Sequence, residues 1–200
     1  MAFKFSELDK KQRSRLYTTL FFVAVVIFFI VNNISGEEAE GPYPPDYRAD
    51  APKVETKAPN FTLLNMEGET VSLSDFSGKV VIIDFWATWC GPCRKGVPDL
   101  VKLKEDYAEK GVEVIGISLD GITRDGSTVD DIVPFMKEYN INYPIVQGTN
   151  KIVQDYGNII SIPTSFIIDQ KGNIVSRYDQ LVPHSVYETV INKLLESEQR

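Results

Sequence analysis

The chain has 200 residues and a net charge of −7 at pH 7, with two cysteines and one histidine. This length allows one domain with accessory segments. The acidic balance argues against nucleic acid as a partner, and two Cys with one His supply too few ligands for a structural zinc site.

The N-terminal part predicts a membrane anchor. Residues 1–15 carry five basic and two acidic side chains, and the 16–34 run that follows carries none. A helix over this run would span about 28 Å, close to the ~30 Å bilayer core. The flanking charges predict that residues 1–15 lie in the cytoplasm and that the domain after the anchor lies on the exported side of the cell membrane. The alternative is a cleaved signal peptide, whose apolar region is usually shorter, about 7–15 residues.

Residues 35–56 are acidic and rich in proline, which predicts an extended tether. From residue 57 to 200, apolar runs alternate with helical patterns. Strands are predicted at 61–64, 79–85, 112–119, 143–146, 164–168 and 174–178, and helices at 93–110, 129–139, 151–156 and 184–196. This alternation predicts an α/β domain with a mixed sheet flanked by helices and a central helical insertion. A turn at 170–173 makes the last two strands antiparallel.

The two cysteines, Cys90 and Cys93, follow an apolar strand at the start of a predicted helix, with Pro92 in its first turn. The helix N-terminus stabilises a thiolate, so we expect Cys90 to be the nucleophile. Cys93 is placed one turn later, where it would resolve a mixed disulfide. A bridge across so short a loop adds little stability. We therefore interpret the pair as redox-active, without a metal or other cofactor.

The stretch 81–98 contains D-F-W-A-x-W-C-G-P-C, followed by Pro98, and resembles the active site of thioredoxin. Residues 58–61, 71–79 and 162–169 are similar to one branch of that superfamily, the membrane-anchored thiol-disulfide oxidoreductases of the cytochrome c maturation type. The resemblance covers about residues 57 to 198 and implies a thioredoxin fold. Its motifs are specific for the fold and the redox chemistry, and less so for the substrate.

The resemblance also implies roles for several residues. Asp84 would lie buried behind the second cysteine, with a raised pKa, and relay its proton; a purely structural aspartate is the alternative. A cis-proline loop would face the cysteines and bind the client chain. The substrate-binding residues implied are Trp89, Gly91, Pro92, Ile162 and Pro163.

Two glycines depart from the family pattern. Gly116 stands where thioredoxins have a buried lysine near the aspartate, so a partner of Asp84 is absent. Gly96 replaces a glutamate that follows the second cysteine in maturation-type proteins. Without that carboxylate, we expect the Cys90 thiolate to form more readily.

The resemblance implies a reductase of disulfides in exported proteins, such as apocytochrome c, supplied with electrons by a membrane thiol transporter. The C-G-P-C sequence favours reduction, because it is the sequence of thioredoxin, whose potential is about −270 mV. The alternatives are an exported disulfide oxidase or isomerase, and a membrane-tethered assembly factor in which the redox pair is incidental.

Overall fold

The computed structural model describes residues 9, 17–27, 56–123 and 128–198. The chain divides into two compact units, Met1–Gly41 and Pro42–Arg200. In the first unit, residues 17–27 are helical and lie within the predicted anchor. Among the described residues, no helix has both the length and the apolar character that crossing a membrane requires. The rest of the anchor at 16–34, most of the segment 1–15, and residues 35–55 of the tether lie outside the described residues.

The second unit is built on a six-stranded sheet in the order β1-β8-β7-β4-β5-β6. Its strands are β1 (Thr56–Lys57), β4 (Val80–Trp86), β5 (Val112–Ser118), β6 (Ile145–Gln147), β7 (Thr164–Ile168) and β8 (Asn173–Tyr178). The central strand β4 pairs in parallel with β5 and antiparallel with β7. The predicted mixed sheet is therefore confirmed. A separate hairpin joins β2 (Thr62–Leu64) to β3 (Thr70–Ser72).

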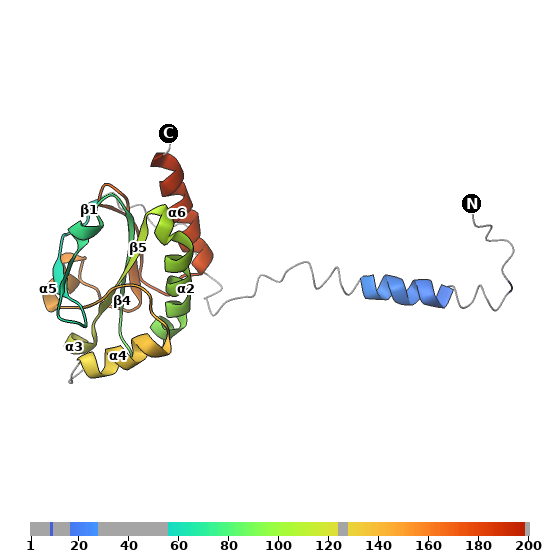
Figure 1. Cartoon of the computed structure of the whole chain (residues 1–200), viewed down its shortest axis with the longest axis horizontal. Coiled ribbons are helices and arrows are strands. Elements are labelled where there is room, and N and C mark those ends of the chain that lie inside the picture. The colour runs from blue at the N-terminus through green and yellow to red at the C-terminus, as the bar shows by residue number, and fades with distance from the viewer. Residues whose placement is uncertain (1–8, 10–16, 28–55, 124–127, 199–200) are drawn as a thin grey trace. The chain divides into compact units, whose positions relative to one another are not determined.

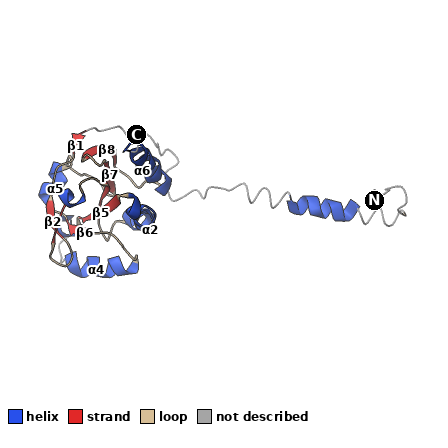
Figure 2. Ribbon diagram, turned by 45° about the horizontal axis from the view of Figure 1, so that its top comes forward, coloured by secondary structure: helices blue, strands red, loops and turns tan. Residues whose placement is uncertain are grey.

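Helices cover both faces of the sheet (Figure 1). The long helices α2 (Gly91–Tyr107) and α6 (His184–Glu198) lie together on one side, and the short α5 (Asn150–Asp155) lies on the other, as Figure 2 also shows. The short helix α3 (Asp120–Thr123) and the inserted helix α4 (Thr128–Glu138) lie at one end of the domain. Two 3-10 turns, η2 (Leu73–Phe76) and η3 (Ala108–Lys110), complete the described elements.

Alternation along β4 builds two separate cores. Side chains at 80, 82 and 86 pack with α2, α4 and α6, and those at 81, 83 and 85 pack under α5 and the β2–β3 hairpin. Every residue of β4 and β5 is buried, as expected for central strands covered on both faces. Asp84 shares the face of residues 80, 82 and 86. The strand pattern thus directs this carboxyl toward α2 and α6.

Several boundaries differ from the prediction. Helix α2 begins at Gly91 rather than residue 93, because Cys90 caps it, and it tightens into η3 over its last three predicted residues. Strand β6 begins at Ile145 rather than residue 143; the preceding Pro144 has no N–H to donate, although its carbonyl accepts a bond from Gly116. Strands β1 and β3, of two and three residues, were not predicted. The antiparallel β7–β8 hairpin is confirmed.

Candidate active site

The cysteine pair lies at the N-terminus of α2. Cys90 and Cys93 form a disulfide with a sulfur–sulfur distance of 2.08 Å, and both residues are buried. Cys90 is the N-cap of the helix, and the backbone N–H of Cys93 donates to its Sγ over 3.2 Å. After reduction, the same N–H would stabilise a thiolate at Cys90. Gly91 and Pro92, in the first turn of the helix, are exposed.

The cis-proline loop faces this pair. The Ile162–Pro163 peptide bond is cis, which confirms the expected conformation. The carbonyl oxygen of Ile162 lies 3.7 Å from Cys90 Sγ. Exposed apolar side chains occur on both segments: Trp89 is 46% exposed and Ile160 is 92% exposed. Exposed apolar side chains therefore lie on the two chain segments that carry Cys90 and Pro163.

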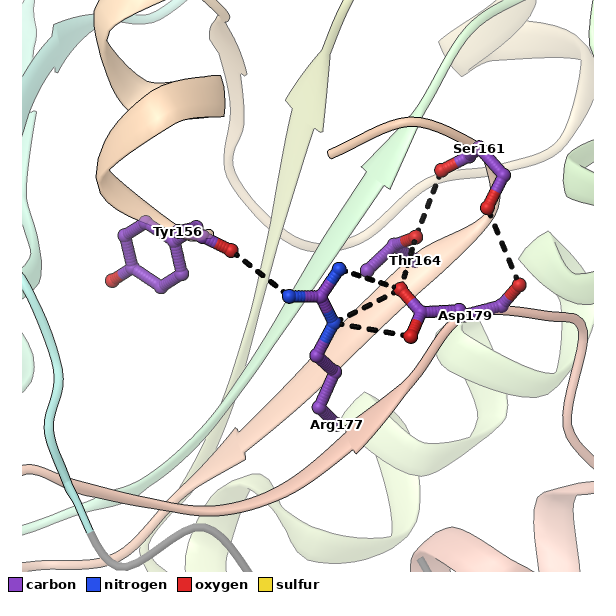
Figure 3. Close-up of polar contacts among 5 residues, drawn as sticks. All are labelled: Tyr156, Ser161, Thr164, Arg177 and Asp179. Atoms are coloured by element: carbon purple, nitrogen blue, oxygen red, sulfur yellow. Dashed lines mark hydrogen bonds and ion pairs between the residues drawn. The ribbon is translucent and has the colours of Figure 1, made fainter. Parts of the chain in front are cut away.

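A polar network holds Ser161 and Thr164, which flank the cis Ile162–Pro163 bond (Figure 3). The guanidinium of Arg177 on β8 donates to both carboxylate oxygens of Asp179 and to the carbonyl of Tyr156, where α5 ends. Asp179 Oδ1 lies 3.3 Å from Thr164 Oγ1, and the Asp179 carbonyl accepts a bond from Ser161. Thr164 Oγ1 also donates to the Ser161 carbonyl over 2.8 Å. The loop is thus fixed on both sides of Pro163. Sequence reasoning did not identify these residues.

Asp84 lies behind the disulfide, in the middle of β4. It is only 5% exposed, and burial raises its pKa from about 3.8 to about 8. Its neighbours in register are Gly116 on β5 and Ser165 on β7. Asp84 and Cys93 line the same small cavity. The structure therefore brings Asp84 to the resolving cysteine, as its motif position implied.

Gly116 lies directly opposite Asp84, and a side chain there would require its neighbours to move. A Cβ atom at this position would lie 2.5 Å from Ile145 Cδ1 and 2.9 Å from Trp86 Nε1. The Trp86 indole is buried against Phe135 of α4, with ring centroids 5.0 Å apart. The space that a lysine would need is therefore filled by apolar side chains. Asp84 has no cationic neighbour on this strand.

A second buried carboxylate, Asp120, holds the segment before Cys90. It accepts hydrogen bonds from the backbone N–H and the hydroxyl of Thr88, at 3.0 and 2.7 Å, and from the Ser118 hydroxyl at 2.8 Å. Sequence reasoning missed this role. The available signal was an Asp two residues after the end of a buried parallel strand, at the same end of the sheet as the cysteines.

Arg94 connects the active-site segment to the inserted helix α4. Its guanidinium donates to the Thr88 carbonyl over 3.2 Å and lies over the rings of Phe135 and Tyr139, 5.1 and 5.4 Å from their centroids. An ion pair with Glu138 adds a contact at 3.6 Å. The insertion therefore packs directly against the first turns of α2.

This arrangement is suited to thiol–disulfide exchange. It combines a capped cysteine, a resolving cysteine one turn away, a buried acid behind them and a backbone carbonyl facing the sulfur. Within the described residues, no cluster of three or more His, Cys, Asp or Glu side chains could hold a metal ion.

Known proteins resemble the chain in both sequence and structure. Residues 54–177 match the AhpC/TSA family. The thiol-disulfide oxidoreductase ResA of Oceanobacillus iheyensis is 36% identical over 174 residues, which cover 83% of this chain and 82% of that protein. ResA of Bacillus thuringiensis subsp. konkukian is 38% identical over 120 residues, but the match spans only 65% of its length and 60% of this chain.

The fold is also found among solved structures. The crystal structure of a thiol:disulfide interchange protein of the thioredoxin family from Chlorobium tepidum superposes with a TM-score of 0.62 at 28% identity, covering 75% of this chain and 99% of that one. The α/β architecture and the redox pair at the start of α2 agree with these matches. The chain therefore belongs to the AhpC/TSA family and, within it, to the thioredoxin-fold thiol-disulfide oxidoreductases of the ResA type.

Proposed function

We propose that the protein is a membrane-tethered reductase of disulfides in exported proteins. The observation that carries the proposal is the Cys90–Cys93 pair at the N-terminus of α2, facing the cis Ile162–Pro163 peptide. A thiolate at Cys90 is stabilised there, and the adjacent loop offers backbone groups to an extended client chain. The reduced pair is the electron source for the reaction.

The exchange proceeds in two steps. The Cys90 thiolate attacks a client disulfide, a mixed disulfide forms, and one client sulfur leaves as a thiolate. Cys93 then attacks Cys90 Sγ, which closes the Cys90–Cys93 bond and releases the second client sulfur. The Cys93 thiol must lose its proton for this attack, and Asp84 is placed to accept it. The client gains two electrons and the enzyme pair loses two.

The exported location is supported by the sequence, through the basic residues before the apolar run 16–34 and the acidic residues after it. On this basis residues 16–34 anchor the chain in the cell membrane, with the N-terminus in the cytoplasm. A membrane thiol transporter would re-reduce the Cys90–Cys93 pair, and apocytochrome c is a suitable client.

Reductase activity is tested by insulin reduction with an external dithiol as the electron donor. We expect turnover by the wild-type chain and none by Cys90→Ser. Cys93→Ser should accumulate mixed disulfides with its clients, which identifies them. If the wild-type chain binds exported proteins but reduces no disulfide, the alternative of an assembly factor with an incidental redox pair is correct. Faster oxidation of reduced clients than reduction of oxidised ones would instead indicate an oxidase.

A further inference from the structure

Asp84 must lose its proton again in every catalytic cycle. This requirement rests on the proposed function, in which Asp84 accepts the proton of Cys93. The carboxyl lies on a central strand between β5 and β7 and is 5% exposed. A buried acid exchanges protons with solvent through bridging water or polar groups. The structure must therefore provide a path from Asp84 to the surface.

A small cavity lies behind the disulfide and touches Asp84. The volume of this cavity is about 10 Å³, and Cys93 also lines it. This is the lower limit of the roughly 10–15 Å³ that one water needs. Gln180, an exposed residue, lines it as well and marks its outer end. Leu181 closes the side next to α2, where a Cβ on Gly96 would lie 2.7 Å from Leu181 Cδ1.

The polar group from α6 at this cavity is Tyr187. Its hydroxyl donates to Ser165 Oγ over 2.8 Å, and both residues are buried. Because a phenol has a single hydrogen, Tyr187 Oη acts toward other groups only as an acceptor. Ser165 is the residue directly opposite Asp84 in the β4–β7 register. Tyr187 Oη is therefore bonded to the residue opposite Asp84 in the sheet, and Asp84 and Tyr187 both line the cavity.

We propose that this cavity is the proton exit of Asp84 and that Tyr187 is its positioning residue. One water molecule in the cavity takes the proton of the neutral Asp84 carboxyl and passes a proton to bulk water beside Gln180. The same water donates a hydrogen bond to Tyr187 Oη, which holds it in place. The Asp84 O–H bond breaks, the carboxylate is restored, and no electrons move.

Two other titratable groups face Asp84. Cys93 on α2 is held in the disulfide and does not titrate in the oxidised protein. Tyr143, before β6, has its pKa raised well above its ordinary value by burial and by the charge of Asp84, so it stays neutral. Among the residues that line the cavity, Asp84 is the only one with a carboxyl group. A titration observed there thus reports on Asp84.

The experiment compares two tyrosine variants of the full-length, oxidised chain. Carbon NMR of labelled aspartate, assigned with Asp84→Asn, follows the Asp84 titration. Tyr187→Phe removes the partner of the water, and the carboxylate loses solvation. We expect the midpoint of the Asp84 titration to rise by about one pH unit. A shift of this size corresponds to the loss of one hydrogen bond to a charged group. Ser165→Ala should act in the same direction.

Tyr178→Phe is the matched control. Tyr178 is buried in the same core, with its ring centroid 6.2 Å from that of Tyr187. It does not line the cavity, so the Asp84 midpoint should not move. Equal shifts from the two tyrosine variants, or no shift from Tyr187→Phe and Ser165→Ala, would overturn the proposal.

A kinetic measurement then connects the cavity to the reaction. The rate at which Cys93 releases a client from the mixed disulfide should rise with pH along the Asp84 titration, and Tyr187→Phe should displace this rise by the same amount. If the wild-type chain reduces no client, the proposed function fails, whereas the NMR titration still decides whether the cavity holds the water. A displaced titration with an unchanged rate profile would overturn the catalytic part of the inference.

Discussion

Two buried aspartates near the disulfide have different surroundings. Asp120 accepts hydrogen bonds from Thr88 and Ser118, which satisfy its carboxylate and fix the segment before Cys90. Asp84 lies against apolar side chains and a small cavity, and burial raises its pKa to about 8. The first suits a structural anchor. The second suits a group that exchanges protons near neutral pH.

The raised pKa of Asp84 predicts a pH-dependent stability. Between about pH 4 and pH 8 the folded chain keeps the Asp84 proton that the unfolded chain releases, so this group makes the fold less stable as pH rises. Asn cannot ionise, so Asp84→Asn should be more stable than wild type at pH 9 by roughly 2–5 kcal/mol, with little difference near pH 4. Urea unfolding of the oxidised protein at both pH values measures this. A difference that does not change with pH would contradict it.

The hydrogen bonds of Asp120 predict a different result. Asp120→Ala leaves buried donors on Thr88 and Ser118 without an acceptor and should cost about 3 kcal/mol of unfolding free energy. Asp120→Asn keeps one oxygen acceptor and should cost less. The matched control is Asp75→Ala, which removes an exposed carboxylate that also accepts a backbone N–H, from Ser72 at 2.8 Å, and should cost about 1 kcal/mol. Equal losses of unfolding free energy from Asp75→Ala and Asp120→Ala would show that burial of the carboxylate does not increase the loss.

At the scale of elements, α2 is held very close to the chain segment that follows β8. Gly96 is buried in the helix, and Leu181 occupies the space that a side chain would need. Glycine weakens a helix interior by about 1 kcal/mol relative to Ala. Close packing over the cavity thus explains a residue that helix propensity disfavours. This position is also where the maturation-type pattern has a glutamate.

Replacing Gly96 and Leu181 together tests how the absence of a carboxylate at position 96 affects the Cys90 thiolate. Gly96→Glu with Leu181→Ala makes room for the new side chain beside the cysteine pair. The added carboxylate should disfavour the Cys90 thiolate and slow its alkylation by iodoacetamide at pH 7 several-fold. Gly96→Gln with Leu181→Ala provides the same bulk without charge. If the Glu and Gln pairs react at the same rate, the glycine acts through packing alone.

The sequence predicted those parts of the site that lie in local motifs. Cys90, Cys93 and Asp84 share one strand–turn–helix stretch, and Pro163 follows a pattern that the thioredoxin resemblance supplies. Asp120, Asp179 and Tyr187 were missed because the contacts that connect them to the site, with Thr88, Thr164 and Ser165, span 32, 15 and 22 residues. A contact of this kind depends on which strands pair, and no local periodicity records it. The short strands β1 and β3 were also missed, although β2 and β6, of three residues each, were predicted.

For the whole molecule, the membrane arrangement gives the simplest test. Basic residues precede the apolar run 16–34 and acidic residues follow it, so the domain is expected on the exported side. An alkaline phosphatase reporter fused after Arg200 should therefore be active, and a cytoplasmic fluorescent reporter at the same position should be dark. Removing the basic flank, with Lys and Arg of 1–15 changed to Ser, is the control and should weaken this preference. Reporter activity in the cytoplasm would contradict the proposal that the clients are exported proteins.

The position of Asp179 in the chain has a consequence for how substitutions combine. Its carboxylate and carbonyl hold the loop around Pro163, and the next two residues, Gln180 and Leu181, line the cavity of Asp84. One short segment therefore constrains both the surface that meets the client and the space behind the resolving cysteine. In a double-mutant cycle, Asp179→Ala and Tyr187→Phe should be non-additive in client release, with a coupling energy of about 0.5–3 kcal/mol. Client selectivity and pH optimum are then linked traits, which mutation of this segment will change together.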